Sequence, residues 1–373
     1  MFSLAAPIGH ADESSQTVDA AESAADSSTV PDTAAGQAAD SEQTQHVVIV
    51  VGAEGRAEFA EVFRQWADRW QTAASQGTAA VSVIGLQELA DGEAAPDESE
   101  AVISDSQKAE SQASDLKALE QLLRSSLSQQ TPEPLWLVLI GHGTFDGRSA
   151  KFNLRGPDLS AEDLQKLLTD ARRPIAVINC ASSSAPFINQ LSGPDRIVIS
   201  ATKDGNEFQF ARFGDYLSLA VGSLQGDLNR DGQTSLLEAW LFAAAQVQQF
   251  YESEGRLATE HSLLDDNGDQ LGTRFEVFDG VRIKDSIDNK ESVDGRLARR
   301  FHLIRSPEES RLTPRQRQQR DELEEKLEQL RQKRDQLPEA DYLRQLEELL
   351  VPLARIYQHA DEALETEESE PGS

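Results

Sequence analysis

The sequence predicts an α/β fold, a three-layer α/β/α sandwich with a mostly parallel sheet, followed by a C-terminal helical hairpin. Short apolar runs, of which Leu135–Ile140 and Ile175–Ile178 are the clearest, end at glycine or polar residues, as do strands buried on both faces of a parallel sheet. Amphipathic helical stretches separate these runs, an alternation typical of doubly wound sheets. Leucines at near-heptad spacing after Thr313 and Pro314 predict the hairpin.

Composition limits the classes of partner. The chain has 373 residues, of which 38% are hydrophobic, and its formal net charge is -30. An acidic surface disfavours nucleic acid and anionic membrane as partners, because both carry the same sign of charge. No run approaches the roughly 18 apolar residues of a membrane span. Cys180 is the single cysteine, so no disulfide can form within the chain.

The first 45 residues differ from the rest. Residues 1–45 are acidic, rich in Ala and Ser, and contain no Lys or Arg. Such a segment buries too little apolar surface to offset its ordering entropy, so we expect it to be disordered. Its opening resembles the end of a secretory signal but lacks a basic n-region and a full apolar h-region. Export is therefore only weakly indicated, and the compartment stays unassigned.

The predicted sandwich spans residues 46–283. Its first strand is Val47–Val51, and apolar residues spaced by three and four from Phe59 to Trp70 predict a helix after it. Ala80–Leu86 is the second predicted strand. Residues 90–114 form an acidic, Ser- and Ala-rich insertion, which we interpret as a surface linker.

The second half of the sandwich repeats this alternation. Leucines over residues 116–127 predict a helix that leads into the Leu135 strand. Ser160 with Asp163 forms a capping-box pattern for a further helix, and Arg196–Ala201 is another strand. Glycines after the first strand, in Gly52–Gly55, match neither the dinucleotide nor the P-loop motif, so a nucleotide-binding domain is disfavoured.

The C-terminal third changes in character. Residues 284–312 are charged and irregular and are predicted to be a linker; residues 313–361 form the hairpin, and residues 362–373 an acidic tail. The leucine stripes of the hairpin could pack on each other, on the sandwich, or on a second copy of the chain. Self-association through these helices, as in a coiled coil, is therefore one expectation.

Two chemically reactive side chains follow the two clearest strands. His142, between Gly141 and Gly143, comes after the first, and Cys180 comes after the second. The carboxyl ends of parallel strands meet at one edge of a sheet, where active sites of open α/β folds lie. An imidazole beside a thiol favours the reactive thiolate. The spacing predicts a Cys-His dyad.

An apolar strand ending in His-Gly, one crossover, and an apolar strand ending in Cys resemble the caspase, legumain and gingipain group (clan CD) of cysteine peptidases. The resemblance covers about Val47 to Val281 and is closest to the legumain-like branch. It implies a caspase-like fold and a cysteine endopeptidase, a hydrolase acting on proteins or peptides. His142 would be the general base, Cys180 the nucleophile, and the backbone N–H groups of Gly143 and Cys180 the oxyanion hole.

The residues around the cysteine depart from the legumain pattern. Ile178, Ala181 and Ser183 stand where legumains have an acidic residue before the cysteine, another after it, and a glycine beyond. Cleavage after Asn is therefore not predicted. The alternative function is a catalytically inactive, calcium-binding interaction scaffold with the same fold.

One loop has the pattern of a calcium site. Residues 227–238 match the EF-hand motif D-x-[DN]-x-[DN]-G-x5-E at every defined position. Calcium prefers six to eight hard oxygen ligands. A single loop without a paired second one favours a structural Ca²⁺ ion over a switch, and a polar turn without metal is the alternative. The predicted ligands are Asp227, Asn229, Asp231, the Gln233 carbonyl, Ser235 and Glu238.

Overall fold

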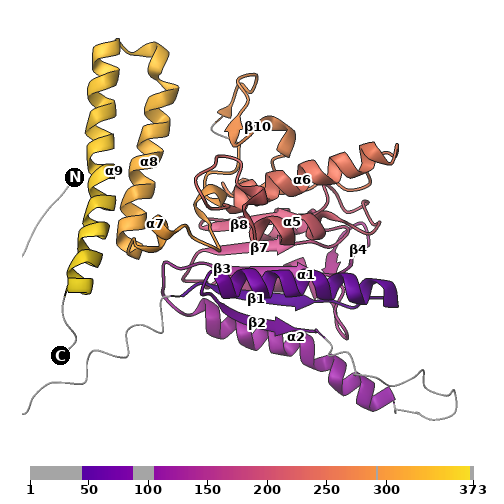
Figure 1. The fold of residues 1–373 in the computed structure, drawn as a ribbon. Helices are drawn as coiled ribbons and strands as arrows, with labels where there is room; N and C mark the ends of the chain where they lie inside the picture. The colour runs from indigo at the N-terminus through magenta and orange to yellow at the C-terminus, as the bar shows by residue number, and fades with distance from the viewer. Residues whose placement is uncertain (1–43, 87–104, 291–292, 370–373) are drawn as a thin grey trace, which may run out of the picture. The chain divides into compact units, whose positions relative to one another are not determined.

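The computed structural model describes residues 44–86, 105–290 and 293–369 (Figure 1). The central strands are β1 (His46–Val51), β2 (Ala80–Ile84), β3 (Leu135–Ile140), β7 (Ile175–Asn179), β8 (Arg196–Ser200) and β9 (Leu263–Asp265). They form one sheet in the order β2-β1-β3-β7-β8-β9, in which β9 is antiparallel to β8 and all other neighbours are parallel. The predicted mostly parallel sheet is confirmed.

Two helical layers cover the sheet. The helices of one layer are α1 (Ala57–Gln76), α5 (Phe213–Val221) and α6 (Leu236–Ser253), and those of the other are α2 (Asp105–Leu127), α3 (Ala161–Leu168) and α4 (Pro186–Leu191). Side chains alternate along β3, so Trp136 and Ile140 face the first layer while Leu135 and Leu139 face the second. Every residue of β3 is buried. The three-layer sandwich is therefore confirmed (Figure 1).

Two small antiparallel sheets and several 3-10 helices complete the described chain. One sheet follows His142 directly and consists of β4 (Gly143–Phe145), β5 (Ala150–Phe152) and β6 (Leu159–Ser160). The other pairs β10 (Phe278–Asp279) with β11 (Arg282–Ile283). The 3-10 helices are η1 (Leu224–Gly226), η2 (Phe275–Val277), η4 (Ala298–Arg300) and η5 (Arg334–Gln336).

Two helix starts agree with the sequence. The Ser160 hydroxyl accepts a hydrogen bond from the Asp163 N–H at 3.1 Å and caps α3. α8 (Pro314–Gln332) begins at the predicted Thr313 cap, with Pro314 at its first position. Each cap satisfies a backbone donor that the helix leaves unpaired.

Two predicted boundaries differ from the structure. α2 begins at Asp105, so the last part of the 90–114 insertion is helical, and residues 90–104 lie outside the described residues. Ordered chain begins before residue 46, because Gln45 is buried and accepts a hydrogen bond from the Trp136 indole at 2.8 Å. Residues 1–43, for which disorder was predicted, are not described.

The segment predicted as a linker, residues 284–312, packs against the sandwich. Phe301 is buried against Trp136 at 5.7 Å between ring centroids, and its carbonyl accepts a hydrogen bond from the Leu236 N–H. Leu303 is buried in the same core. The charged composition of residues 284–312 concealed these apolar side chains, and their burial makes the segment part of the domain.

The hairpin is present, with a longer second arm than predicted. After α7 (Pro307–Ser310), α8 packs against α9 (Glu339–Ser369), as Figure 1 shows. The predicted acidic tail, 362–373, is thus helical up to residue 369. The buried apolar cluster here is small and consists of Leu312, Ile356 and Ala360, packed against Leu323 and Tyr357.

Ion pairs with buried carboxylates supplement this small cluster. Glu133, just before β3, pairs with Arg305 and Arg317, and Glu309 pairs with Arg320. Among the described residues, no helix is both long enough and apolar enough to span a membrane.

Candidate active site

The sheet register brings the two predicted dyad residues to the same edge and the same face. Leu139 pairs with Asn179, so Cys180 lies beside Ile140, and His142 lies two residues further along. Side chains alternate between faces, and both His142 and Cys180 follow the parity of Ile140. Cys180 belongs to the core beneath α1, and the His142 ring contacts Phe63 of α1 at 5.2 Å. Among the described residues, no hydrogen bond joins His142 to Cys180.

His142 is oriented through its backbone and one ring nitrogen. Nε2 lies 3.2 Å from the backbone carbonyl oxygen of Glu54. A carbonyl only accepts, so Nε2 carries the proton in this bond, and Nδ1 of the neutral ring is left as the basic nitrogen. The His142 carbonyl accepts a bond from the Asn153 N–H at 3.0 Å. Burial lowers the pKa of His142, and the Glu54 carbonyl opposes that shift.

Cys180 is enclosed between α1 and α5. Cys180 is 1% exposed. A Cβ atom on Gly214 would lie 2.9 Å from the Cys180 Cβ and 2.5 Å from the Trp66 ring, so only glycine permits this approach of α5. Burial raises the pKa of the thiol to about 12. In this conformation the sulfur is protonated at neutral pH, and the thiolate needed for attack is not available.

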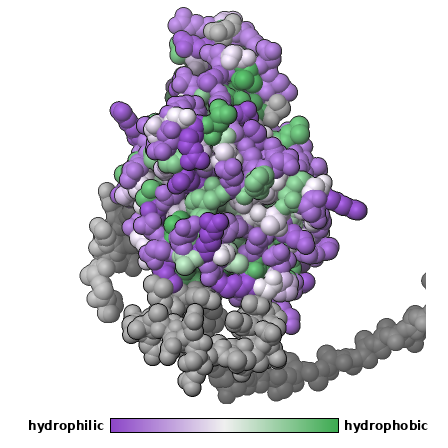
Figure 2. All heavy atoms as spheres, turned by 90° about the vertical axis from the view of Figure 1, so that its right-hand side faces the viewer, coloured by the Kyte–Doolittle hydropathy of each residue, from purple (hydrophilic) through white to green (hydrophobic). Residues whose placement is uncertain are grey.

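An aromatic side chain packs over the His142 ring. The ring of Phe210, in the segment between β8 and α5, lies 6.1 Å from that of His142, 5.9 Å from that of Trp66 and 4.7 Å from that of Phe59. Phe210 is itself half-buried. Figure 2 views the molecule toward the carboxyl edge of the sheet and shows apolar residues gathered near its middle. His142 therefore lies beneath an aromatic cover formed by Phe210.

The segment that carries Phe210 is attached at both ends to one short stretch. The Glu207 carboxylate lies 2.5 Å from Nδ1 of His261 and accepts the His261 N–H. The Glu260 carboxylate accepts the N–H groups of Arg212 and Phe213. Burial raises the pKa of Glu260 to about 7. Adjacent residues 260 and 261 thus fix both ends of the 207–213 segment.

The predicted oxyanion donors have partners inside the protein. The Gly143 N–H donates to the Ser182 hydroxyl at 3.2 Å, and the Cys180 N–H donates to the Leu139 carbonyl at 2.9 Å as part of the sheet. A Cβ on Gly143 would collide with the Ser182 carbonyl oxygen. The glycine at 143 is thus required by a close backbone approach.

Sequence reasoning missed two parts of this site. Glu54 lies in the glycine-rich loop that we tested only for phosphate binding, and its place after β1 at the same edge was the available signal. Phe210 gave no signal, because nothing in its sequence neighbourhood shows which rings it meets.

The acidic side chains of the 227–238 loop accept hydrogen bonds from its own backbone. Asp227 accepts hydrogen bonds from the N–H groups of Arg230, Asp231 and Gly232, and Gly232 has φ +86°. The Glu238 carboxylate is buried and accepts the N–H groups of Leu228, Asn229 and Ser235. Burial raises its pKa. In the described part of the chain, no three His, Cys, Asp or Glu side chains are grouped to hold a metal ion.

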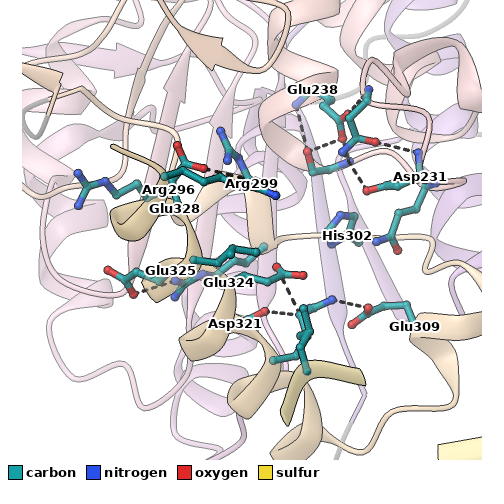
Figure 3. Close-up of a pocket in the computed structure, with 18 of the residues that line it drawn as sticks. Asp231, Glu238, Arg296, Arg299, His302, Glu309, Asp321, Glu324, Glu325 and Glu328 are labelled. Carbon is teal, nitrogen blue, oxygen red and sulfur yellow. Dashed lines mark hydrogen bonds and ion pairs between the residues drawn. The ribbon is translucent and has the colours of Figure 1, made fainter. Parts of the chain in front are cut away.

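A cavity of about 1010 Å³ lies beside this loop (Figure 3). Asp231 and Glu238 line one side, α8 contributes carboxylates on another, and His302 lies between the loop and Glu309. The Gln233 side chain, also from the loop, accepts the Ser306 N–H at 3.1 Å. The loop is therefore tied to the segment that starts the hairpin.

No protein-family model and no curated protein matches the chain. Among solved structures, drICE is 11% identical and matches 63% of this chain and 92% of its own, with a TM-score of 0.35. The Drosophila initiator caspase Dronc is 14% identical over 64% of this chain and 89% of its own, with a TM-score of 0.35. Caspase-1 from Spodoptera frugiperda is 9% identical over 66% and 92%, also at 0.35. These similarities do not identify reacting residues.

Proposed function

We propose that this protein is a cysteine endopeptidase with a His142–Cys180 dyad, and that the described conformation is its closed form. One observation carries the proposal: both side chains lie on one face of one sheet edge, on adjacent strands. The Glu54 carbonyl supports the role of base for His142, because it leaves Nδ1 unprotonated. The substrate would be a protein or peptide.

The reaction follows from these groups. Nδ1 of His142 would take the proton of the Cys180 thiol while the sulfur attacks the peptide carbonyl carbon. The imidazolium would then give that proton to the leaving amine, and water would hydrolyse the thioester with His142 again as base. Gly143 is the more available oxyanion donor, because the Ser182 hydroxyl can rotate away whereas the Cys180 N–H belongs to the sheet. Such a donor contributes roughly 3 kcal/mol to transition-state stabilisation.

The closed form requires a movement before reaction. Trp66 and Gly214 enclose Cys180, and the Phe210 ring packs on Trp66 and His142. Displacement of the 207–213 segment would admit substrate and hydrate the thiol, which lowers its pKa toward the ordinary value. The legumain-like branch is a finer part of this proposal and rests on Ile140–Gly143 and Asn179–Ser183 alone.

The test is hydrolysis of a peptide library by the purified chain, followed by mass spectrometry of the protein after iodoacetamide treatment. We expect Cys180→Ala and His142→Ala each to abolish hydrolysis, and alkylation of Cys180 to do the same. Ser253→Ala, at an exposed serine at the end of α6, serves as the control. Hydrolysis that survives Cys180→Ala would overturn the proposal.

A second candidate, the inactive interaction scaffold, is favoured by the state of the thiol. A residue that is 1% exposed with a thiol pKa of about 12 behaves as a small apolar core residue. If no peptide is cleaved and Cys180 resists alkylation in the native protein but reacts in urea, the scaffold is the better description.

For the loop Asp227–Glu238 we propose a structural Ca²⁺ ion. Its support is the motif together with acidic side chains that already order the loop backbone. Asp227, Asn229, Asp231, Gln233, Ser235 and Glu238 would supply the oxygens. Calorimetric titration should show Ca²⁺ binding that Asp231→Asn weakens at least tenfold, with Asp269→Asn as the control. Equal heats for both variants and the parent chain would contradict it.

A further inference from the structure

An ion pair lies behind His142. Nη2 of Arg155, in the loop between β5 and β6, lies 2.6 Å from the Glu54 carboxylate. Nη1 of the same guanidinium donates to the carbonyls of Gly85 and, at 3.4 Å, Val51. The Arg155 and Glu54 side chains are 18% and 30% exposed. One side chain thus joins the end of β1, the turn after β2 and the loop that follows β1.

Glu54 connects this ion pair to the imidazole. Its side chain meets Arg155, while its backbone carbonyl accepts from Nε2 of His142. The neighbouring Ala53 N–H donates to the Asn153 carbonyl at 2.9 Å, and the Asn153 N–H donates to the His142 carbonyl. The loop is attached to the rest of the sandwich through the Gly52 N–H, which donates to the Ile140 carbonyl, through Asn153 and through Arg155. The Glu54 carbonyl also accepts the Arg56 N–H at 2.7 Å, whereas the Glu54 side chain is held by Arg155.

We propose that Arg155 is a positioning residue for His142. By fixing Glu54, it keeps the carbonyl oxygen within hydrogen-bond distance of Nε2–H and so selects the tautomer in which Nδ1 is unprotonated. The catalytic consequence rests on the proposed peptidase function, whereas the choice of tautomer does not. The hydrogen bond made by one ring nitrogen commonly decides which of the two nitrogens of a histidine carries the proton.

The alternative is that Arg155 only stabilises the fold. Its bonds to Gly85 and Val51 would contribute to stability whether or not His142 reacts. A purely structural role would lower the free energy of unfolding of a variant and leave the tautomer of the folded fraction unchanged. The tautomer is therefore the measurement that separates the two.

The experiment is nitrogen NMR of the full chain labelled at its histidine rings, with His142 assigned by comparison with His142→Gln. We expect the Nε2–H form in the parent chain and a mixture of both tautomers in Arg155→Gln. Arg155→Lys, which retains the charge, should recover part of the parent signal. Arg148→Gln, an exposed arginine of the same region, is the matched control and should change nothing.

Activity gives an independent second measurement. With the peptide substrate, Arg155→Gln should lower kcat about tenfold with KM unchanged, as is typical when an orienting partner is lost. If Arg155→Gln does not fold, Glu54→Gln removes the same ion pair and should give the same mixture. A folded variant that retains the parent tautomer overturns the inference. If the parent chain has no peptidase activity but Arg155→Gln still shifts the tautomer of His142, the inference is supported and the proposed function is refuted.

Discussion

The dyad edge and the hairpin cavity surround their ionisable groups with opposite environments. At the edge, His142 and Cys180 lie near aromatic rings, and no charged side chain among the described residues shifts the pKa of the thiol. In the cavity, Arg320 is paired with buried Glu309, and other arginines face the carboxylates of α8. Burial without a partner favours the neutral form of a group, whereas a close opposite charge favours the ionised form. One chain thus builds an uncharged site and a charged one.

The largest expected effect concerns the charged region. Arg320 and Glu309 are 7% and 3% exposed, so Arg320→Met would leave a buried carboxylate without its partner. We expect a loss of about 3–5 kcal/mol in the free energy of unfolding, measured by urea denaturation. Arg331→Met, which breaks an exposed pair on the same helix, should cost less than about 1 kcal/mol. Similar losses for both would show that the cavity does not depend on buried charge pairing.

The pH dependence of stability should have opposite signs in the two regions. Burial lowers the pKa of His302, in the cavity, from 6.5 to about 4. Its contribution to stability is therefore present above pH 6.5 and is lost as pH falls toward 4. Burial raises the pKa of Glu260, near the edge, from 4.5 to about 7. The contribution of Glu260 to the free energy of unfolding is therefore present below pH 4.5 and is lost as pH rises through 7.

Two variants separate the contributions of His302 and Glu260 to the pH dependence of stability. The two intervals nearly coincide, so the two contributions oppose each other in the parent chain. His302→Asn should remove the contribution that rises with pH, and Glu260→Gln the one that falls, each changing the stability difference across its interval by about 3 kcal/mol and in opposite directions. Urea denaturation at half-unit pH steps measures both. Burial likewise raises the pKa of Asp294 to about 7, so Glu260→Gln will leave part of the neutral slope in place. If each variant merely shifts the whole curve without a change of slope, these groups do not titrate as described.

A smaller effect tests the aromatic cover of the dyad. Phe210→Ala removes the ring over His142 and Trp66, and we expect about a tenfold faster alkylation of Cys180 by iodoacetamide, followed by mass spectrometry. Phe208→Ala, on the same segment and 74% exposed, should not change the rate. An equal acceleration in both variants would indicate general loosening of the segment instead of a specific cover.

The smallest effect concerns the predicted self-association. Leu343, Leu350 and Val351 are exposed on α9 and offer an apolar surface. If this surface binds a second copy, the mass in light scattering should rise with protein concentration. Leu350→Glu should abolish that rise while changing the free energy of unfolding by less than about 0.5 kcal/mol. A mass that stays at one chain over the whole range would exclude this surface as an interface.

The predictable parts of the fold were those set by local patterns. The strands β3 and β7 followed from uninterrupted apolar runs, and the starts of α3 and α8 from their capping residues. The 284–312 segment was wrongly predicted to be a linker, because its many charged residues concealed the apolar Phe301 and Leu303. α9 extends beyond its predicted end at residue 361, because the acidic residues that follow include no proline or glycine to end the helix before residue 369.

The sequence by itself determined the layered sheet and the placement of His142 and Cys180 at one edge, because apolar runs, their alternation with helices and the residues that end them are local properties. Only the tertiary structure decided the state of that edge. The enclosure of the thiol by Trp66 and Gly214, the cover by Phe210 and the Arg155–Glu54 support of His142 join residues remote in sequence. Burial and pairing depend on those distant contacts, and they fix the charge of a reactive group.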